Sequence, residues 1–464
     1  MPKKAGQTTL GSLFTRKIIR NLSIVLCMLL ISSEFTTAQN SRVFVVNQIE
    51  YIGNQKTKDY VLAIELTFRE GDTITDLKRE LHKSTENLIN TRLFHDVDID
   101  YIEHHNLLNI IITVQERWYL WPIPIFEYAD PNFASWLRRK EIDYLNYGII
   151  LEERNFRGKN EKVRLKLRRG IREMYGVEYI FPQLTRYRNL GGTVDVAYFQ
   201  QKELHHKISD RQYVTLESDR YIYYEQRFLA SLLWRQGYYK RHAFYAGYRR
   251  FDYHRSIDSL FGETVRPTSD YLNLGYRFKY FRGDYIVYPL QGQKIQLNAE
   301  SGLSKQPYIY VDVEMSTHHK LHNRWTFSYG INSYVSFTQN FPHFLYIGPG
   351  KTWYIRGFED YAFHNDLLIL NRLQLKYTLL KRRTIHIKQV VSEKFNSPYF
   401  AIYINGFTEI GYGNNIVRQS DEITPVSIGL GFDLLTYYDW VGRMEFVLNS
   451  ENKVWFNIHW GYIF

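Results

Sequence analysis

The chain offers few side chains in the patterns that catalysis or metal binding requires. Gly350, Lys351 and Thr352 match the end of a phosphate-binding P-loop, but Leu345 stands where that motif needs its first glycine. No Gly-x-Ser-x-Gly nucleophile motif is present. Six of the 15 histidines form adjacent pairs, which is not the spacing of metal ligands: His104–His105, His205–His206 and His318–His319. The sequence therefore predicts no enzymatic activity, no metal site and no cofactor.

The N-terminal segment has the pattern of a secretory signal peptide. Basic residues precede a short apolar run over residues 22–31, and small or polar residues follow as far as Ala38. The run is too short to span a bilayer as a helix. We therefore expect a signal peptide over residues 1–38. The only cysteine, Cys27, lies inside it, so the mature chain has no thiol for disulfides or metal binding.

The last eleven residues alternate between apolar and polar or small side chains. Asn457, His459 and Gly461 separate apolar neighbours, which predicts a strand with period two. A transmembrane β-barrel is built from such strands of about ten residues. The composition agrees, because 17% of the 464 residues are aromatic and 39 are tyrosine. Aromatic girdles mark both membrane interfaces of these barrels.

Sixteen segments from residue 118 onward have the pattern of strands. An even number returns both ends of a bacterial barrel to the periplasmic side. We expect extracellular loops over residues 203–224, 252–268 and 338–366 and a long periplasmic turn over residues 381–397. The segments begin near Pro122, Tyr147, Glu161, Tyr175, Gly192, Gln226, His242, Asp270, Gln293, Tyr308, Trp325, Leu367, Tyr399, Thr424, Val441 and Lys453.

The net charge of +11 would ordinarily suggest binding to nucleic acid or to a membrane surface. Part of this charge belongs to the signal peptide. Further basic residues alternate with apolar ones along predicted strands, as Arg164, Lys166 and Arg168 do, and would line the barrel lumen. We therefore predict no nucleic-acid partner.

Residues 42–117 are predicted to form a separate α+β domain before the barrel of residues 118–464. A strand over residues 43–52 is followed by helices over residues 58–67 and from Thr75. Residues 94–101 and 107–114 alternate as a hairpin. An exposed sheet edge in such a domain can accept an extended polypeptide as an added strand. The pattern alone favours a small domain without a partner, and only the neighbouring barrel reverses this preference toward the binding role.

Four motifs in the barrel region carry a family resemblance. The sixth extracellular loop contains Gly348-Pro-Gly350 and then Ile355, Arg356, Gly357 and Phe358, which resembles the Val/Ile-Arg-Gly-Phe signature of the BamA/TamA superfamily. The others resemble turn and strand motifs of that family, and the α+β domain resembles its POTRA module. The other three motifs are Asn155-Phe-Arg-Gly158, Phe407-Thr-Glu409-Ile-Gly411 and Gly429-Leu-Gly431.

The resemblance implies a fold: a 16-stranded, all-β outer-membrane barrel of antiparallel strands preceded by one POTRA domain in the periplasm. It also implies that the loop returns into the lumen, where its arginine contacts carboxylates on the barrel wall. Strand alternation independently turns Glu409 inward, and it turns Asp433 inward in the same way. We therefore predict that Arg356 pairs with Glu409, Asp433 or both.

The junction of the first and last strands is predicted to be weakly paired. Pro122 and Pro124 cannot donate hydrogen bonds to a neighbouring strand, and proline is tolerated mainly at sheet edges and bulges. The two prolines, together with Trp460 and the terminal Phe464, define the predicted seam. The terminal Phe464 also resembles the sorting signal of outer-membrane barrels. The alternative is that both prolines belong to a linker between the two domains.

The family resemblance implies a factor that assembles or translocates other proteins at the bacterial outer membrane. Its partners would be outer-membrane lipid and unfolded polypeptide clients, bound at the POTRA strand edge and at the barrel seam. Accessory periplasmic or lipoprotein partners are also implied. The alternative is a dedicated exporter of one polypeptide, as in two-partner secretion, although the sequence has room for only one POTRA domain and no plug helix.

Overall fold

The computed structural model describes residues 42–460 except 129–144, 185–188, 210–211, 255–267, 339–354, 359–365, 393 and 415–422. The predicted signal peptide and Phe464 lie outside the described residues. Among the helices that are described, none has the length and apolar character needed to cross a membrane.

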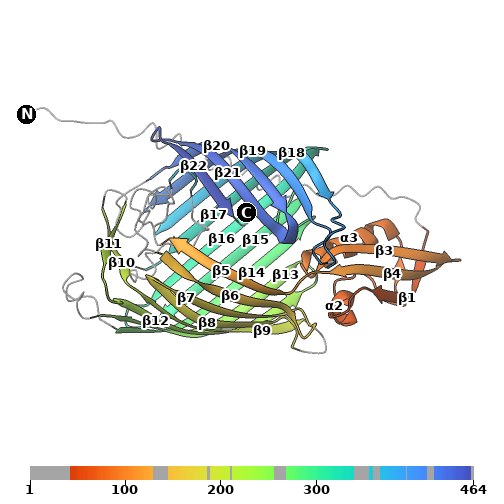
Figure 1. Ribbon diagram of the computed structural model, residues 1–464, viewed down its shortest axis with the longest axis horizontal. Coiled ribbons are helices and arrows are strands. Elements are labelled where there is room, and N and C mark those ends of the chain that lie inside the picture. Colours follow the sequence, from red (N-terminus) through yellow and green to blue (C-terminus); the bar gives the residue numbers. More distant parts are fainter. Residues whose placement is uncertain are drawn as a thin grey trace, which may run out of the picture. The chain divides into compact units, whose positions relative to one another are not determined.

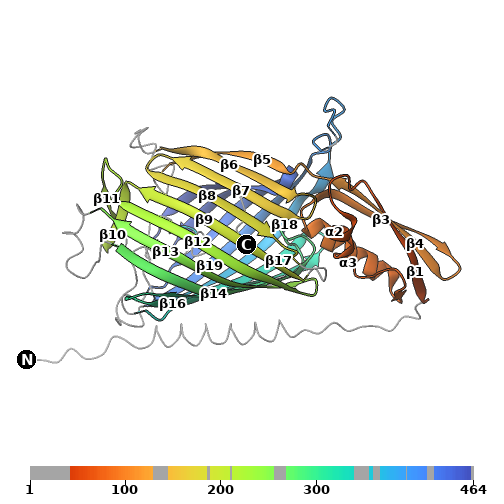
Figure 2. The ribbon, with the colours of Figure 1, turned by 90° about the horizontal axis from the view of Figure 1, so that it is seen from below.

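The N-terminal domain is a four-stranded sheet covered by helices (Figure 2). The strand order is β2-β1-β4-β3, with β1 parallel to β4 and the other pairs antiparallel. The first helix is shorter than predicted, and Asp76 rather than Thr75 caps the second. The elements are β1 (Phe44–Ile52), α2 (Asp59–Ala63), β2 (Thr73–Ile74), α3 (Leu77–Asn90), β3 (Phe94–His104) and β4 (Leu107–Glu116).

A separate apolar core stabilises this domain. Leu62 on α2, Leu88 on α3 and Ile112 on β4 are fully buried in one cluster. Alternate residues of β4 are buried, because one face of the strand lies against the helices.

Sixteen antiparallel strands form one sheet that curls into a barrel (Figure 1). The predicted fold class and strand number are confirmed, and the largest differences in strand starts, three residues, occur at β8 and β12. The strands are β5 (Leu120–Tyr128), β6 (Leu145–Phe156), β7 (Glu161–Arg169), β8 (Arg172–Phe181), β9 (Leu190–Gln201), β12 (Tyr223–Gln236), β13 (Lys240–Tyr253), β14 (Thr268–Gly283), β15 (Gly292–Leu303), β16 (Tyr308–His322), β17 (Trp325–Ser336), β18 (Leu367–Thr384), β19 (Tyr399–Asn414), β20 (Val426–Thr436), β21 (Trp440–Asn449) and β22 (Val454–Trp460).

The two faces of the barrel wall differ in polarity. On the outer face, Leu430 and Phe446 are 65% and 60% exposed. On the inner face, Asp433 and Glu445 are fully buried on the same two strands, β20 and β21. This alternation is the pattern of a lipid-facing band around a polar lumen.

Two connections differ from the predictions. No strand is predicted within the extracellular loop of residues 203–224, but this segment contains the hairpin of β10 (Glu203–Ser209) and β11 (Gln212–Glu217). Leu204 of this hairpin packs into an aromatic cluster, which gives the loop an apolar anchor. The periplasmic turn expected from residue 381 starts later, because β18 continues to Thr384.

Candidate functional site in the barrel lumen

The loop segment of residues 355–358 forms a tight turn against the inner wall. The Phe358 N–H donates to the Ile355 carbonyl over 3.1 Å, and both side chains pack with Leu370. Gly357 has φ +83°, and a Cβ there would lie 3.0 Å from a methyl carbon of Val447. Glycine is therefore required both by the backbone conformation and by the close approach to β21.

Arg356 is held by two carboxylates from different strands. Its Nε donates to Glu409 Oε1 and its Nη1 to Glu445 Oε1, each over 2.7 Å. Its backbone N–H also donates to Glu409 Oε2 over 2.9 Å. The Arg356 side chain is only 1% exposed, so these contacts replace the water that a loop arginine would otherwise bind.

Asp433 does not pair with Arg356, contrary to one of the two predicted pairings. Its carboxylate accepts a hydrogen bond from Arg443 Nε over 2.7 Å, because Arg443 lies directly opposite on β21. It also accepts bonds from Tyr288 and Asn405. The second carboxylate for Arg356 is instead Glu445, which the sequence analysis missed. Strand alternation would have placed Glu445 in the lumen together with Arg443.

Guanidinium and carboxylate groups alternate around this site. Arg372 lies opposite Glu409 in the ladder, with its Nε 3.0 Å from Glu409 Oε1. Three guanidinium groups thus meet three carboxylates: Arg356, Arg372 and Arg443 with Glu409, Asp433 and Glu445. Each of these guanidinium groups has a carboxylate partner, so removal of one member would leave an orphaned charge in a buried site.

The ring of Phe407 packs against the guanidinium group of Arg356. The guanidinium carbon lies 3.5 Å from the ring centroid, a cation–π contact. Gly429 on the next strand makes room for this ring, because a Cβ there would lie 2.4 Å from a Phe407 ring carbon. Two of the motifs recognised in the sequence are thus parts of one structure that holds the loop.

A periplasmic turn enters the lumen from the opposite end. Residues 284–291 connect β14 to β15, and Val287 and Tyr288 pack among buried residues of β19, β20 and β21. The Tyr288 hydroxyl donates to Asp433 Oδ2 over 2.6 Å. The turn and the extracellular loop therefore meet the same charged network, the turn through Asp433 and the loop through Glu409 and Glu445.

The N-terminal domain contacts the barrel through a buried carboxylate. Asp439, in the turn between β20 and β21, accepts from Arg117 Nη1 over 2.5 Å and from Arg92 Nε over 2.9 Å. Tyr285 donates to it as well. Burial raises the pKa of the Asp439 carboxyl, but the two guanidinium groups outweigh burial and hold this pKa well below its usual range.

The turn after β6 contributes a second contact with the same domain. Asn155 Nδ2 donates to Thr57 Oγ1 over 2.8 Å, and the Gly158 carbonyl accepts from the Lys58 N–H over 3.0 Å. Gly158 has φ +74°, and a Cβ there would lie 2.0 Å from the Lys56 carbonyl oxygen. This Asn-Phe-Arg-Gly turn therefore needs its glycine for direct backbone contact.

The predicted seam residues lie on the two terminal strands of the sheet. Pro122 and Pro124 pair in register with Leu151 and Ile149 of β6, so this segment is a strand and not a linker. Trp460 pairs in register with Gly442 at the end of β22. The described residues contain no cluster of His, Cys, Asp and Glu placed to hold a metal ion.

Comparisons with known proteins support this architecture. Residues 44–117 match the family model "POTRA: Surface antigen variable number repeat". No curated protein sequence matches the chain. The fold is similar to CdiB from Escherichia coli, with 12% identity, a TM-score of 0.54, and coverage of 90% of this chain and 75% of that one. BamA from Haemophilus ducreyi lacking POTRA domains 1–3 is also similar, with 13% identity, a TM-score of 0.48, and coverage of 90% and 85%.

Proposed function

We propose that this chain, which combines the POTRA domain and 16-stranded barrel of the BamA/TamA-type outer-membrane superfamily, assembles polypeptide clients into the outer membrane. The POTRA domain, in the periplasm, recruits the client. The seam between β5 and β22 then offers strand edges for the client to pair with. Client folding drives the process without a nucleotide or metal.

The POTRA sheet has one long free edge suited to recruitment. The sheet order leaves β3 with a single neighbour, β4. Tyr101 and Ile102 near the end of β3 are 46% and 59% exposed. An extended client can add to such an edge through backbone hydrogen bonds, with its side chains contacting the exposed apolar residues.

The observation that carries the proposal is the direction of the β5 amides. The Arg154 N–H donates to the Tyr119 carbonyl over 2.9 Å, so odd-numbered residues of this segment direct their backbone groups toward β6. Even-numbered residues direct theirs away from β6, toward the seam. Pro122 and Pro124 occupy two of those positions, and neither has an N–H to donate. A strand ladder formed along this edge of β5 therefore lacks two hydrogen-bond donors.

The lumen anchor favours exit through the seam over passage through the pore. Arg356 fixes the extracellular loop inside the barrel, and Tyr288 fixes the periplasmic turn to the same network. A polypeptide crossing the lumen would have to break these buried contacts. A dedicated exporter would do so in each transport cycle, whereas an assembly factor can keep them.

Site-specific photocrosslinking in cells tests this proposal. A crosslinking amino acid at Phe126, on the outer face of β5, reports the seam, one at Asn332 on the inner wall of β17 reports the lumen, and one at Leu272 on the outer face serves as control. We expect client adducts at Phe126 and none at Leu272. Adducts at Asn332 alone would favour the exporter, and the absence of adducts at both sites would contradict a client-handling role.

A further inference from the structure

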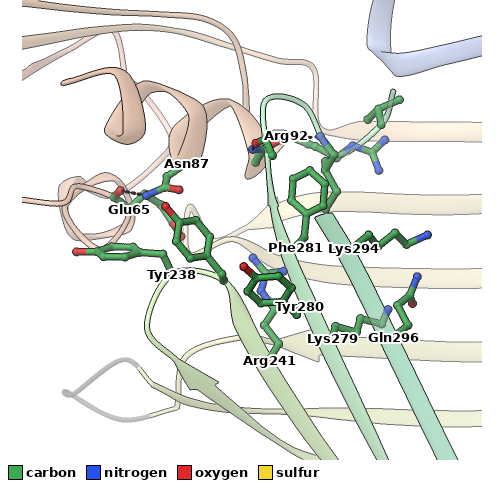
Figure 3. Close-up of a pocket in the computed structure, with 15 residues that line it drawn as sticks. Glu65, Asn87, Arg92, Tyr238, Arg241, Lys279, Tyr280, Phe281, Lys294 and Gln296 are labelled. Carbon is green, nitrogen blue, oxygen red and sulfur yellow. Dashed lines mark hydrogen bonds between the residues drawn. The ribbon is translucent and has the colours of Figure 1, made fainter. Parts of the chain in front are cut away.

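A cavity of about 280 Å³ lies at the periplasmic ends of β13, β14 and β15. Its walls include Arg241, Lys279, Lys294 and Gln296 from these strands, and Figure 3 shows Lys279, Lys294 and Gln296 projecting toward the same side. Aromatic residues of the strand ends, including Tyr280 and Phe281, complete part of the lining. The cavity thus combines cationic and aromatic groups.

The cations that line the cavity outnumber the carboxylates that pair with them. Lys294 pairs with Glu314 over 2.6 Å, and Arg92 pairs with Asp439. The one carboxylate in the lining, Glu65, is bound by Arg235 through two bonds of 2.6 Å. After these pairs are formed, Arg241 and Lys279 remain as an excess of positive charge.

The register places these two cations directly opposite each other. Arg241 of β13 pairs with Lys279 of β14, and alternation turns both side chains into the lumen, on the same face as Tyr245 and Asn273. Like charges directly opposite in an antiparallel pair destabilise it. Both side chains remain exposed within the cavity, so they are available to a ligand. An anion between them would convert the repulsion into attraction.

We propose that Arg241 and Lys279 form a binding site for the carboxylate side chains of an incoming client polypeptide. The lumenal position favours a polypeptide over a membrane lipid, because the barrel wall separates these groups from the bilayer. The neighbouring aromatic rings provide contacts for the apolar residues of the same segment. This inference rests on the proposed client-handling function for the nature of its ligand, and it assigns acidic segments as the part of the client that is bound.

Binding of a fluorescein-labelled octaglutamate peptide to the purified full-length chain in detergent micelles tests the site. Fluorescence anisotropy should show saturable binding at low ionic strength, and octaglutamine should not bind. The double variant Arg241→Gln/Lys279→Gln should weaken octaglutamate binding by about tenfold or more, equivalent to about 1.4 kcal/mol. The matched control is Lys159→Gln, in an exposed periplasmic turn, which removes one positive charge elsewhere and should retain the affinity.

Two further measurements separate the outcomes. The double variant should unfold at a higher denaturant concentration than the unliganded parent, because the like-charge pair is gone. A lower unfolding midpoint would contradict the claim that Arg241 and Lys279 repel each other. Inorganic phosphate should compete only weakly, and competition as strong as that of the peptide would overturn the polypeptide ligand. Unchanged peptide binding in the double variant would overturn the site. Client adducts at Phe126 without octaglutamate binding would refute this inference alone, whereas binding without adducts would refute the proposed function.

Discussion

The guanidinium group of Arg356 lies over the ring of Phe407, with 3.5 Å between the guanidinium carbon and the ring centroid. The same group reaches Glu409 and Glu445 through two different nitrogens. Only a planar group with several fixed donors can stack on a ring and bind two carboxylates together. This geometry gives a physical reason for arginine at the position and predicts how substitutions will behave.

Arg356→Ala should release the loop and destabilise the barrel. The substitution leaves Glu409 and Glu445 buried with fewer compensating charges, which costs about 3–5 kcal/mol for a desolvated pair. Arg356→Lys should recover only part of this loss, because one ammonium group cannot reproduce the forked contacts. The measurements are the free energy of unfolding in denaturant and the protease accessibility of the loop from outside the cell.

Arg220→Ala is a suitable control for this prediction, because Arg220 is an exposed residue before β12. Its stability should stay within about 0.5 kcal/mol of the parent. Equal stability and equal loop protection in Arg356→Ala would show that the arginine does not anchor the loop.

Gly429→Ala should disturb the same anchor without removing a charge. The added Cβ would lie 2.4 Å from the Phe407 ring and 2.5 Å from the Phe446 carbonyl oxygen, so the ring or the backbone must move. Overpacking of this kind costs about 1–3 kcal/mol. Gly406→Ala is the matched control on the neighbouring strand, because its Cβ would meet only a Leu430 methyl carbon, at 3.7 Å. Protease sensitivity of the loop should rise in the first variant and not in the second.

Strand alternation was sufficient to predict much of the lumen wall, but it did not give the pairing of its charges. It placed Glu409 and Asp433 inward, as the structure has them. Choosing between them as partners of Arg356 requires the register, which sets Arg443 opposite Asp433 and Arg372 opposite Glu409. Register in such hairpins is set by the type and length of the connecting turn, which the alternation of side chains along a single strand does not give.

The sequence pattern also did not predict the extracellular hairpin of β10 and β11. The loop has few features of its own, and its position depends on Leu204 reaching a cluster of aromatic residues from other strands. Both POTRA helices were predicted, but their ends were not: α2 ends at Ala63 instead of residue 67, and Asp76 instead of Thr75 caps α3. Local signals thus predict the elements better than their ends.

Acid should loosen the contact between the POTRA domain and the barrel, through His95. Its ring stacks on Tyr437, with 4.4 Å between centroids. Burial, reinforced by Arg117, lowers the pKa of His95 to about 3. The docked state therefore binds fewer protons than a released state with the ordinary value of about 6.5, so docking weakens as the pH falls through this interval. At pH 4.5 the loss amounts to roughly 2–3 kcal/mol.

Hydrogen exchange of the turn at residues 437–439, followed from pH 7 to pH 4.5, measures this effect. His95→Phe keeps an aromatic ring and should remove most of the dependence above pH 4. Asp439 adds to the pH dependence of docking only below about pH 4, the ordinary pKa of an aspartate. Its own pKa is depressed, so its pairing is lost at still lower pH. His82→Gln, on the exposed face of α3, should retain the full pH dependence. The same dependence in His95→Phe would assign the effect to another group.

Replacing both seam prolines should raise the stability of the barrel and impair its handling of clients. Pro122→Val/Pro124→Val restores two N–H donors at positions of β5 that point away from β6. Each new hydrogen bond at the junction with β22 should add about 0.5–1.5 kcal/mol to the free energy of unfolding. A more firmly paired seam leaves fewer free edges for a client, so client adducts at Phe126 should decrease. Pro398→Val is the control, because Pro398 precedes β19 and lies far from the seam in the strand order. A doubly substituted barrel with unchanged stability and undiminished adducts would show that the missing donors do not govern the seam.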